Sequence, residues 1–193
     1  MQEQRLAQAL AAHVGEILTP ETAARILAFS VGGVRIKTAA LQWGECGRLT
    51  FEAVHFSKDI QDLLHPLQLE YWAEAGEGEM RLDYADLERR DARGDLLQFI
   101  AWDNDKPAGF IRVFLSHSLD TGKRIAMEHA VYLRHPYRVG RTLPQFVQYV
   151  ETCLQQIGVK QVRIQAARRH GLPVLAQRLG YRPTHTVLVK DLE

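Results

Sequence analysis

The segment that most constrains this chain is a strand pattern that runs through a short loop directly into a helix pattern. Residues 125–133 form the apolar strand pattern, and the loop after it carries Arg138, Gly140 and Arg141. The N–H groups in the first turn of a helix have no partner within the helix, and the helix dipole adds positive charge there. Arginine forms charge-assisted contacts with phosphate oxygens. The pattern therefore predicts an anion site, and this order of elements suggests a phosphorylated cofactor.

Composition bounds the class of protein. The 193 residues are 46% hydrophobic and 24% charged, which is typical of one globular domain with or without an appendage. A formal net charge of +1 gives no reason to expect a polyanionic partner. Cys46 and Cys153 lie far apart without metal-ligand spacing, so we expect free thiols, no metal site and a cytoplasmic protein. No apolar run approaches the ~20 residues of a membrane span, and charges interrupt the N-terminal apolar pattern.

Hydrophobic periodicity divides the chain near residue 47. We interpret residues 1–47 as a helical N-terminal extension packed on the main domain, because apolar residues recur at helical spacing before Thr19-Pro20, which restarts a helix. From residue 48 the periods predict strand, helix, helix, three strands, helix, strand, helix, strand, and tight turns make the three strands an antiparallel meander. The expected strands are 49–56, 96–102, 108–115, 125–133, 159–166 and 181–192, and the expected helices are 59–74, 83–93, 143–157 and 172–179.

This order of elements and two short motifs resemble the GNAT N-acetyltransferase superfamily over residues 48–193. Arg138-Val139-Gly140-Arg141-Thr142-Leu143 takes the place of the superfamily loop Arg/Gln-x-x-Gly-x-Gly/Ala. Leu179-Gly180-Tyr181 matches a second landmark, a helix that ends in Leu-Gly-Phe/Tyr. A narrower similarity, carried by the segment from Pro66 to Glu74, is to GNAT-like proteins encoded by tailed bacteriophages, which would place the protein in the host cytoplasm.

The resemblance implies a fold and a cofactor. The fold is α/β (α+β), with a mixed central sheet flanked by helices that splays after the strand at 125–133. Acetyl-CoA lies in the splay, with its pyrophosphate on the loop amides and its pantetheine arm along the strand backbone. Carried onto this chain, the implied cofactor contacts are Val131, Leu133, Arg138, Val139, Gly140, Arg141, Thr142 and Leu143.

The resemblance also implies transfer of an acetyl group from acetyl-CoA to a primary amine by direct attack. An acidic residue on the strand at 125–133 is a frequent general base in the superfamily, which makes Glu128 the first candidate and His129 the second. Strand alternation places Glu128 on one face with Ala126, Ala130 and Tyr132, and His129 on the other with Met127, Val131 and Leu133. Tyr132 is a candidate proton donor to the leaving thiolate, with packing beside the cofactor as its alternative.

Two other functions stay open at the level of sequence. Leu143 and Ala176 stand where relatives often carry a small residue and a catalytic tyrosine, which fits a GNAT-fold protein that binds or inhibits without turnover. Arg168 and Arg169 permit a phage nucleobase-modifying relative, although a net charge of +1 offers little affinity for DNA. The expected partner is an amine-bearing small molecule or protein, with nucleic acid less favoured and no membrane, and the expected state is a monomer or homodimer.

Overall fold

The computed structural model describes residues 35–75, 79–165 and 172–184, with a few isolated positions before residue 24. The two helices expected before residue 34, the Arg168-Arg169 pair and the last strand beyond residue 184 lie outside the described residues. The strands are β1 (Gly44–Cys46), β2 (Leu49–Val54), β3 (Leu96–Asp103), β4 (Lys106–His117), β5 (Arg124–Leu133) and β6 (Gln161–Arg163). The helices are η1 (Thr38–Ala40), α3 (Lys58–Ala75), α4 (Tyr84–Arg93), η2 (His135–Tyr137), α5 (Thr142–Gln156) and α6 (Leu172–Arg178).

The six strands form one mixed sheet in the order β1-β2-β3-β4-β5-β6. Neighbouring strands from β1 to β5 are antiparallel, and β6 runs parallel to β5. The α/β fold and the meander of β3, β4 and β5 are therefore confirmed. Strand β1 was not expected, because three residues are too few to show a period, and β6 is shorter than the strand predicted at 159–166.

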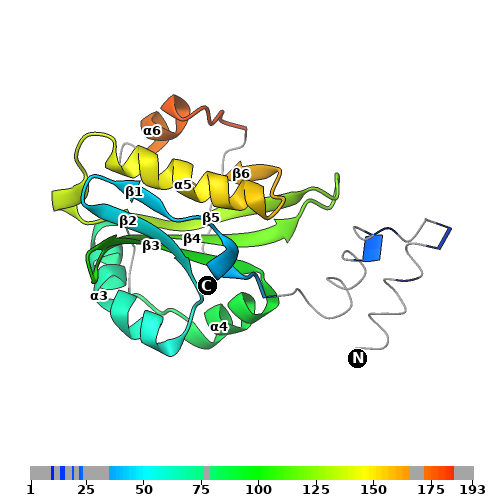
Figure 1. The fold of residues 1–193 in the computed structure, drawn as a ribbon, viewed down its shortest axis with the longest axis horizontal. Coiled ribbons are helices and arrows are strands. Elements are labelled where there is room, and N and C mark those ends of the chain that lie inside the picture. The colour runs from blue at the N-terminus through cyan, green and yellow to red at the C-terminus, as the bar shows by residue number, and fades with distance from the viewer. Residues whose placement is uncertain are drawn as a thin grey trace, which may run out of the picture.

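Helices α3 and α4 cover one face of the sheet and α5 covers the other (Figure 1). Under α3, Leu64 and Leu67 pack with Ile100 and Phe110 of the sheet. Under α5, Phe146 stacks on Phe51 of β2, with ring centroids 4.7 Å apart. Each fully buried side chain of this size contributes about 1.5–3 kcal/mol, so the two clusters fix both layers against the sheet.

Residues 35–46, which the periodicity assigned to the extension, pack against the sheet and α4. Strand β1 pairs with β2 through a turn in which Gly47 has a φ of 61°. The Arg35 guanidinium lies 2.7 Å from the buried carboxylate of Asp91 in α4. Within the described residues, no helix is long and apolar enough to cross a bilayer.

The sheet opens between β5 and β6. The two strands pair only at Ile125, Ala126 and Met127, so the rest of β5 has no strand partner on that edge among the described residues. A bulge lies at the same place on the other edge of β5, where Val113 of β4 faces Glu128 and Arg112 faces Ala130. His129 is thus an extra residue of β5, and Glu128 lies where β5 and β6 part.

Candidate functional site

The loop between β5 and α5 presents free backbone donors. Among the described residues, the amides of Val139, Gly140, Arg141 and Leu143 have no hydrogen-bond acceptor. No side chain caps the N-terminus of α5. Gly140 has a φ of 57°, a left-handed conformation that glycine adopts without strain, and its surroundings are open. The loop and the first turn of α5 therefore leave several N–H groups free at the positive end of the helix dipole, which suits an anion.

The arginines near this loop differ in how their charges are compensated. Arg134 donates to both carboxylate oxygens of Glu70 in α3, at 2.7 Å from Nη2 and 2.9 Å from Nε. Arg138 lies with Nη2 2.7 Å from Glu74 Oε2, and its Nε donates to the carbonyl of Leu133. Arg141 is exposed and has no ion pair within the part of the chain that the structure describes. Arg141 is therefore the loop arginine whose charge α3 does not neutralise.

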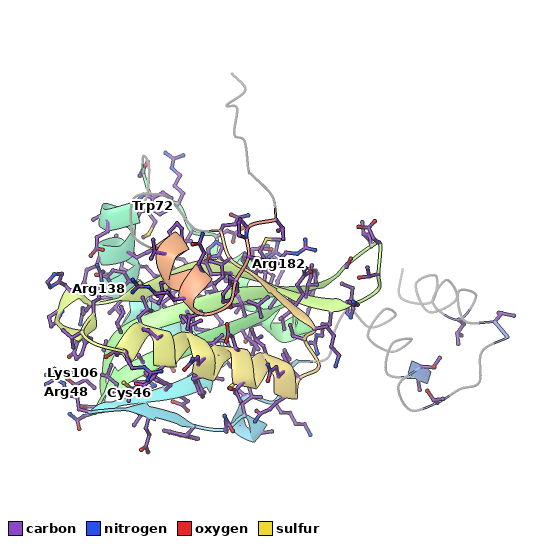
Figure 2. All side chains as sticks on the ribbon, turned by 90° about the horizontal axis from the view of Figure 1, so that it is seen from above. Cys46, Arg48, Trp72, Lys106, Arg138 and Arg182 are labelled. Atoms are coloured by element: carbon purple, nitrogen blue, oxygen red, sulfur yellow. The ribbon has the colours of Figure 1, made fainter. Side chains whose placement is uncertain are left out.

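A second group of basic side chains lies at the same end of the sheet. Figure 2 labels the two, Arg48 and Lys106, at that end of the sheet. Arg48 lies 3.2 Å from Asp103 Oδ2, and its guanidinium stacks over the Tyr137 ring at 5.0 Å. Lys106 faces Asp103 across the β3–β4 turn. These contacts place the Arg48–Asp103 ion pair against Tyr137, just before the loop that begins α5, with Lys106 beside Asp103.

For the remaining loop and strand residues implied to contact the cofactor, the side chains are engaged within the protein, so only backbone groups could bind a ligand. Leu143 is half-buried and packs into the core under α5, so its side chain does not cover the free amides. The Thr142 hydroxyl donates to the carbonyl of Val139 at 2.9 Å. Val131 and Leu133 also pack into that core, and their backbone lies at the open edge of β5, where the Leu133 carbonyl already accepts from Arg138 Nε.

Glu128 is a buried carboxyl at the opening between β5 and β6. It is 9% exposed, and its Oε2 accepts a hydrogen bond from the backbone N–H of Gln165 at 3.3 Å. Burial raises the pKa of Glu128 to about 7, and the bond from Gln165 offsets part of that rise. A carboxyl with this pKa exchanges protons near neutrality, as a general base must.

The expectation that Glu128 shares a face with Ala130 and Tyr132 is wrong. Ala130 and Tyr132 pack in the cluster under α3. Glu128 faces Val113, which belongs to the cluster under α5. The bulge at His129 breaks the alternation of β5, so residues on its two sides exchange faces.

His129 lies on the α3–α4 side, edge-on to the ring of Phe114 with centroids 4.8 Å apart. Desolvation of the ring, with the positive charges of Arg112 and Arg90, lowers the pKa of His129 to about 4, although part of the residue faces solvent. At neutral pH the imidazole is uncharged and a weak proton acceptor, so the geometry favours Glu128 over His129 as the base.

Tyr132 is also on the α3 side, with its hydroxyl 3.1 Å from Glu70 Oε2 and 3.3 Å from Glu74 Oε1. Burial and the hydrogen bond to Glu70 raise the pKa of Tyr132 to about 12. Its proton is therefore held by the carboxylates of α3. Tyr181 is engaged as well, because its hydroxyl bonds to Glu151 of α5 and burial raises the pKa of the phenol.

Several residues around this site escape sequence reasoning. The acids Glu70 and Glu74 lie four apart on α3 and meet Arg134 and Arg138, which also lie four apart. Arg112 is buried in the middle of β4. Arg112 stands out in the sequence as the one charged residue in the apolar run 108–115. A lone charged residue in a strand pattern does not, however, indicate which residues it contacts.

No family model matches the sequence, and no curated protein matches it. Solved structures do match. An aminoglycoside acetyltransferase from an uncultured soil metagenomic sample, in complex with sisomicin, has a TM-score of 0.63 at 12% identity, covering 76% of this chain and 97% of that chain. A ribosomal-protein-alanine N-acetyltransferase from Brucella melitensis biovar Abortus 2308 has a TM-score of 0.59 at 14% identity, covering 74% and 99%.

A third structure, AAC(6')-Iy in complex with the bisubstrate analog CoA-S-monomethyl-acetylneamine, has a TM-score of 0.59 at 16% identity, covering 74% of this chain and 98% of that chain. The fold of this chain is therefore that of the GNAT acetyltransferases. The narrower similarity to phage-encoded proteins stays a prediction.

Proposed function

We propose that this protein is an N-acetyltransferase that moves the acetyl group of acetyl-CoA onto a primary amine by direct attack. The observation that carries the proposal is Glu128, a buried carboxyl with a pKa near 7 at the point where β5 and β6 separate. Helix α5, which follows the loop with the free amides, packs on the face of the sheet that Glu128 shares with Val113. Strand β5 thus offers a base, and the loop that leads into α5 offers an anion site.

The residues present suit acetyl-CoA as the acetyl donor. The free amides from Val139 to Leu143 would hold the pyrophosphate, with Arg141 adding a charge that no carboxylate neutralises among the described residues. The open edge of β5 would pair with the amide groups of the pantetheine arm at Val131 and at the N–H of Leu133, because the Leu133 carbonyl accepts from Arg138. Lys106 and Arg48 lie beyond the loop, where they would meet further phosphate charge.

Glu128 would act as the base, directly or through one water. At pH 7 about half of a group with pKa near 7 is ionised, so Glu128 can accept a proton from the ammonium form of the acceptor. The neutral nitrogen then bonds to the thioester carbon, the C–S bond breaks with its electron pair on sulfur, and a second proton of the nitrogen neutralises the thiolate. Positioning and a backbone N–H on the carbonyl oxygen would supply most of the acceleration.

A second function has its own support. The phenols of Tyr132 and Tyr181 are bound to carboxylates, and Ala176 is a buried residue of α6, so no free tyrosine serves as proton donor among these three positions. A GNAT-fold protein that binds CoA without turnover would show this pattern.

For the first function, acetyl transfer, we propose an amine-bearing small molecule or protein as the acceptor.

Two measurements distinguish acetyl transfer from CoA binding without turnover: calorimetry with acetyl-CoA, and then an assay of thiol release in the presence of amines. Sisomicin, a peptide with N-terminal alanine and spermidine sample three classes of amine. Binding with amine-dependent release of CoA supports acetyl transfer. Binding without release supports the second function. Absence of heat at millimolar acetyl-CoA contradicts both.

A further inference from the structure

Arg112 carries a buried charge without a counter-ion. The residue is 1% exposed, its Nε donates to Gln98 Oε1 at 2.9 Å, and its Nη2 has no hydrogen-bond partner among the described residues. The guanidinium lies against the rings of Phe56 and Phe110, at 5.3 and 5.7 Å from their centroids. No described carboxylate forms an ion pair with it.

Such an arrangement is unfavourable for folding. Moving an ion out of water is costly, and buried charges are normally paired or neutralised. Burial lowers the pKa of Arg112 to about 10, so the group still holds its proton at neutral pH. An unbranched apolar side chain of similar length would fill the same space without that cost. Packing alone therefore does not account for a guanidinium at this position.

Arg112 lies on the α3 side of the sheet, opposite the face toward which Glu128 points, at the register of the bulge. It faces Ala130 across the β4–β5 pair, one step from the bulge at His129 and two residues of β5 from Glu128. Tyr71 of α3, held edge-on between Phe110 and Tyr132 at 6.1 Å from each, feels the charges of both Glu128 and Arg112.

The other groups around the guanidinium do not neutralise it. Tyr84 of α4 acts on it only as a neutral phenol at physiological pH. Arg90 of α4 contributes positive charge at His129, although Asp86 pairs with it at 2.5 Å. Among the described residues, the Arg112 guanidinium is thus a buried and unpaired positive charge on the α3–α4 side of the bulge, against the rings of Phe56 and Phe110. In such surroundings a fixed charge acts over longer distances than in water.

We propose that Arg112 is an electrostatic residue of the acetyl transfer, whose fixed charge stabilises the negative charge that develops on the thioester oxygen. This role rests on the proposed function. When the amine nitrogen bonds to the carbonyl carbon, the π electron pair moves onto oxygen, and the pair returns as the C–S bond breaks. Arg112 neither contacts the substrate nor exchanges a proton. Because its charge is already in place, no reorganisation is needed as the oxyanion forms.

The test compares Arg112→Met, which removes the charge, with Arg112→Lys, which keeps it. Steady-state kinetics use acetyl-CoA with whichever of sisomicin, the alanine-terminal peptide or spermidine the wild type acetylates. We expect Arg112→Met to lower kcat about tenfold and leave KM for acetyl-CoA unchanged, whereas Arg112→Lys stays within about threefold of wild type. The Met variant should melt within a few degrees of wild type or above it, because it no longer buries a charge.

Arg124→Met is the matched control. Arg124 is another desolvated arginine of the sheet, at the far end of β5, and it donates to the carbonyl of Ile157 at 2.7 Å. Its replacement should lower the melting temperature and leave kcat within about twofold. A second readout needs no turnover: NMR titration should find the pKa of His129 higher in Arg112→Met than in wild type or Arg112→Lys, because one positive neighbour is lost.

Each other outcome contradicts the role. A Met variant with wild-type kcat, a Lys variant as slow as the Met variant, an unchanged His129 pKa, or a Met variant that melts well below wild type would assign Arg112 to packing alone. These results leave the proposed function intact as long as the wild type acetylates an amine. A wild type that binds acetyl-CoA without releasing thiol overturns the proposed function and this role together.

Discussion

Arg138 of the β5–α5 loop lies with Nη2 2.7 Å from Oε2 of Glu74, on the helix that covers the opposite face of the sheet. The Arg138 guanidinium also stacks over the Tyr132 ring at 5.1 Å. The loop that begins α5 is therefore tied to α3 by a charge pair that any anion at the loop would meet. A phosphate can either displace Glu74 from Arg138 or bind to Arg138 while Glu74 still holds the arginine in position.

The first prediction follows from that pair. Glu74→Gln removes the carboxylate that neutralises Arg138, so affinity for CoA should rise about two- to fivefold. Both side chains are more than one-third exposed, so the melting temperature should change little. Calorimetry with CoA measures the affinity. Asp62→Asn is the control, since it breaks an exposed pair with Lys58 on the same helix and should leave CoA binding unchanged. Weaker binding in Glu74→Gln would instead show that Glu74 positions Arg138 for the ligand.

The second prediction concerns the pH dependence of activity. Because burial raises the pKa of Glu128 to about 7, kcat/KM should rise with pH through that value as the carboxylate forms. Glu128→Gln should lose a factor of about 10²–10⁴ in rate and the inflection with it. Stopped assays from pH 5.5 to pH 9 on both proteins provide the profile. An inflection near 7 that survives in the Gln variant would assign the titration to another group.

The third prediction concerns stability and the same carboxyl. The pKa of Glu128 is raised in the folded protein from an ordinary 4.5, so its contribution to stability is fully present below pH 4.5 and is lost as pH rises through about 7. Above pH 7 the buried carboxylate lowers the free energy of unfolding by up to about 3 kcal/mol.

Glu128→Gln, whose amide oxygen can still accept from Gln165, should therefore be more stable than wild type at pH 8 and similar to it at pH 5. Urea unfolding at the two pH values measures the difference. Equal stability of the two proteins at pH 8 would contradict a buried ionised carboxylate.

The fourth prediction uses two glycines in the same conformation. Gly140 in the loop has a φ of 57°, and Gly122 at the β4–β5 turn has a φ of 64°. Alanine at either position should cost about 1 kcal/mol, because an L-residue is strained in the left-handed region. Only Gly140→Ala should weaken CoA binding, since only this loop carries the free amides. Matched losses of affinity in both variants would show that binding follows global stability rather than the loop.

Local patterns predicted much of this fold. The loop and α5 were predictable because an apolar strand, a glycine and a helical period leave few arrangements open. The bulge was not, since it arises from the pairing of Glu128 and Ala130 with consecutive residues of β4, and the β5 sequence alone contains no sign of it. This one inserted residue moved Glu128 to the other face.

The contacts between distant segments were likewise out of reach. Arg138 reads as a free cation in sequence, and only the packing of α3 on the sheet brings Glu74 to it. Leu143 stands where relatives often carry a small residue, and only the structure shows that the start of α5 directs its side chain into the core. In both cases tertiary packing, rather than the neighbouring residues in the chain, determines what the side chain contacts.

Acetyl transfer by Glu128 is tested most directly by mass spectrometry of the amine after incubation with acetyl-CoA and the protein. We expect an acetylated amine with the wild type at pH 8 and loss of nearly all product with Glu128→Gln, while both proteins bind acetyl-CoA equally. Absence of acetylated product from a wild type that binds acetyl-CoA, or equal product from the two proteins, would contradict it.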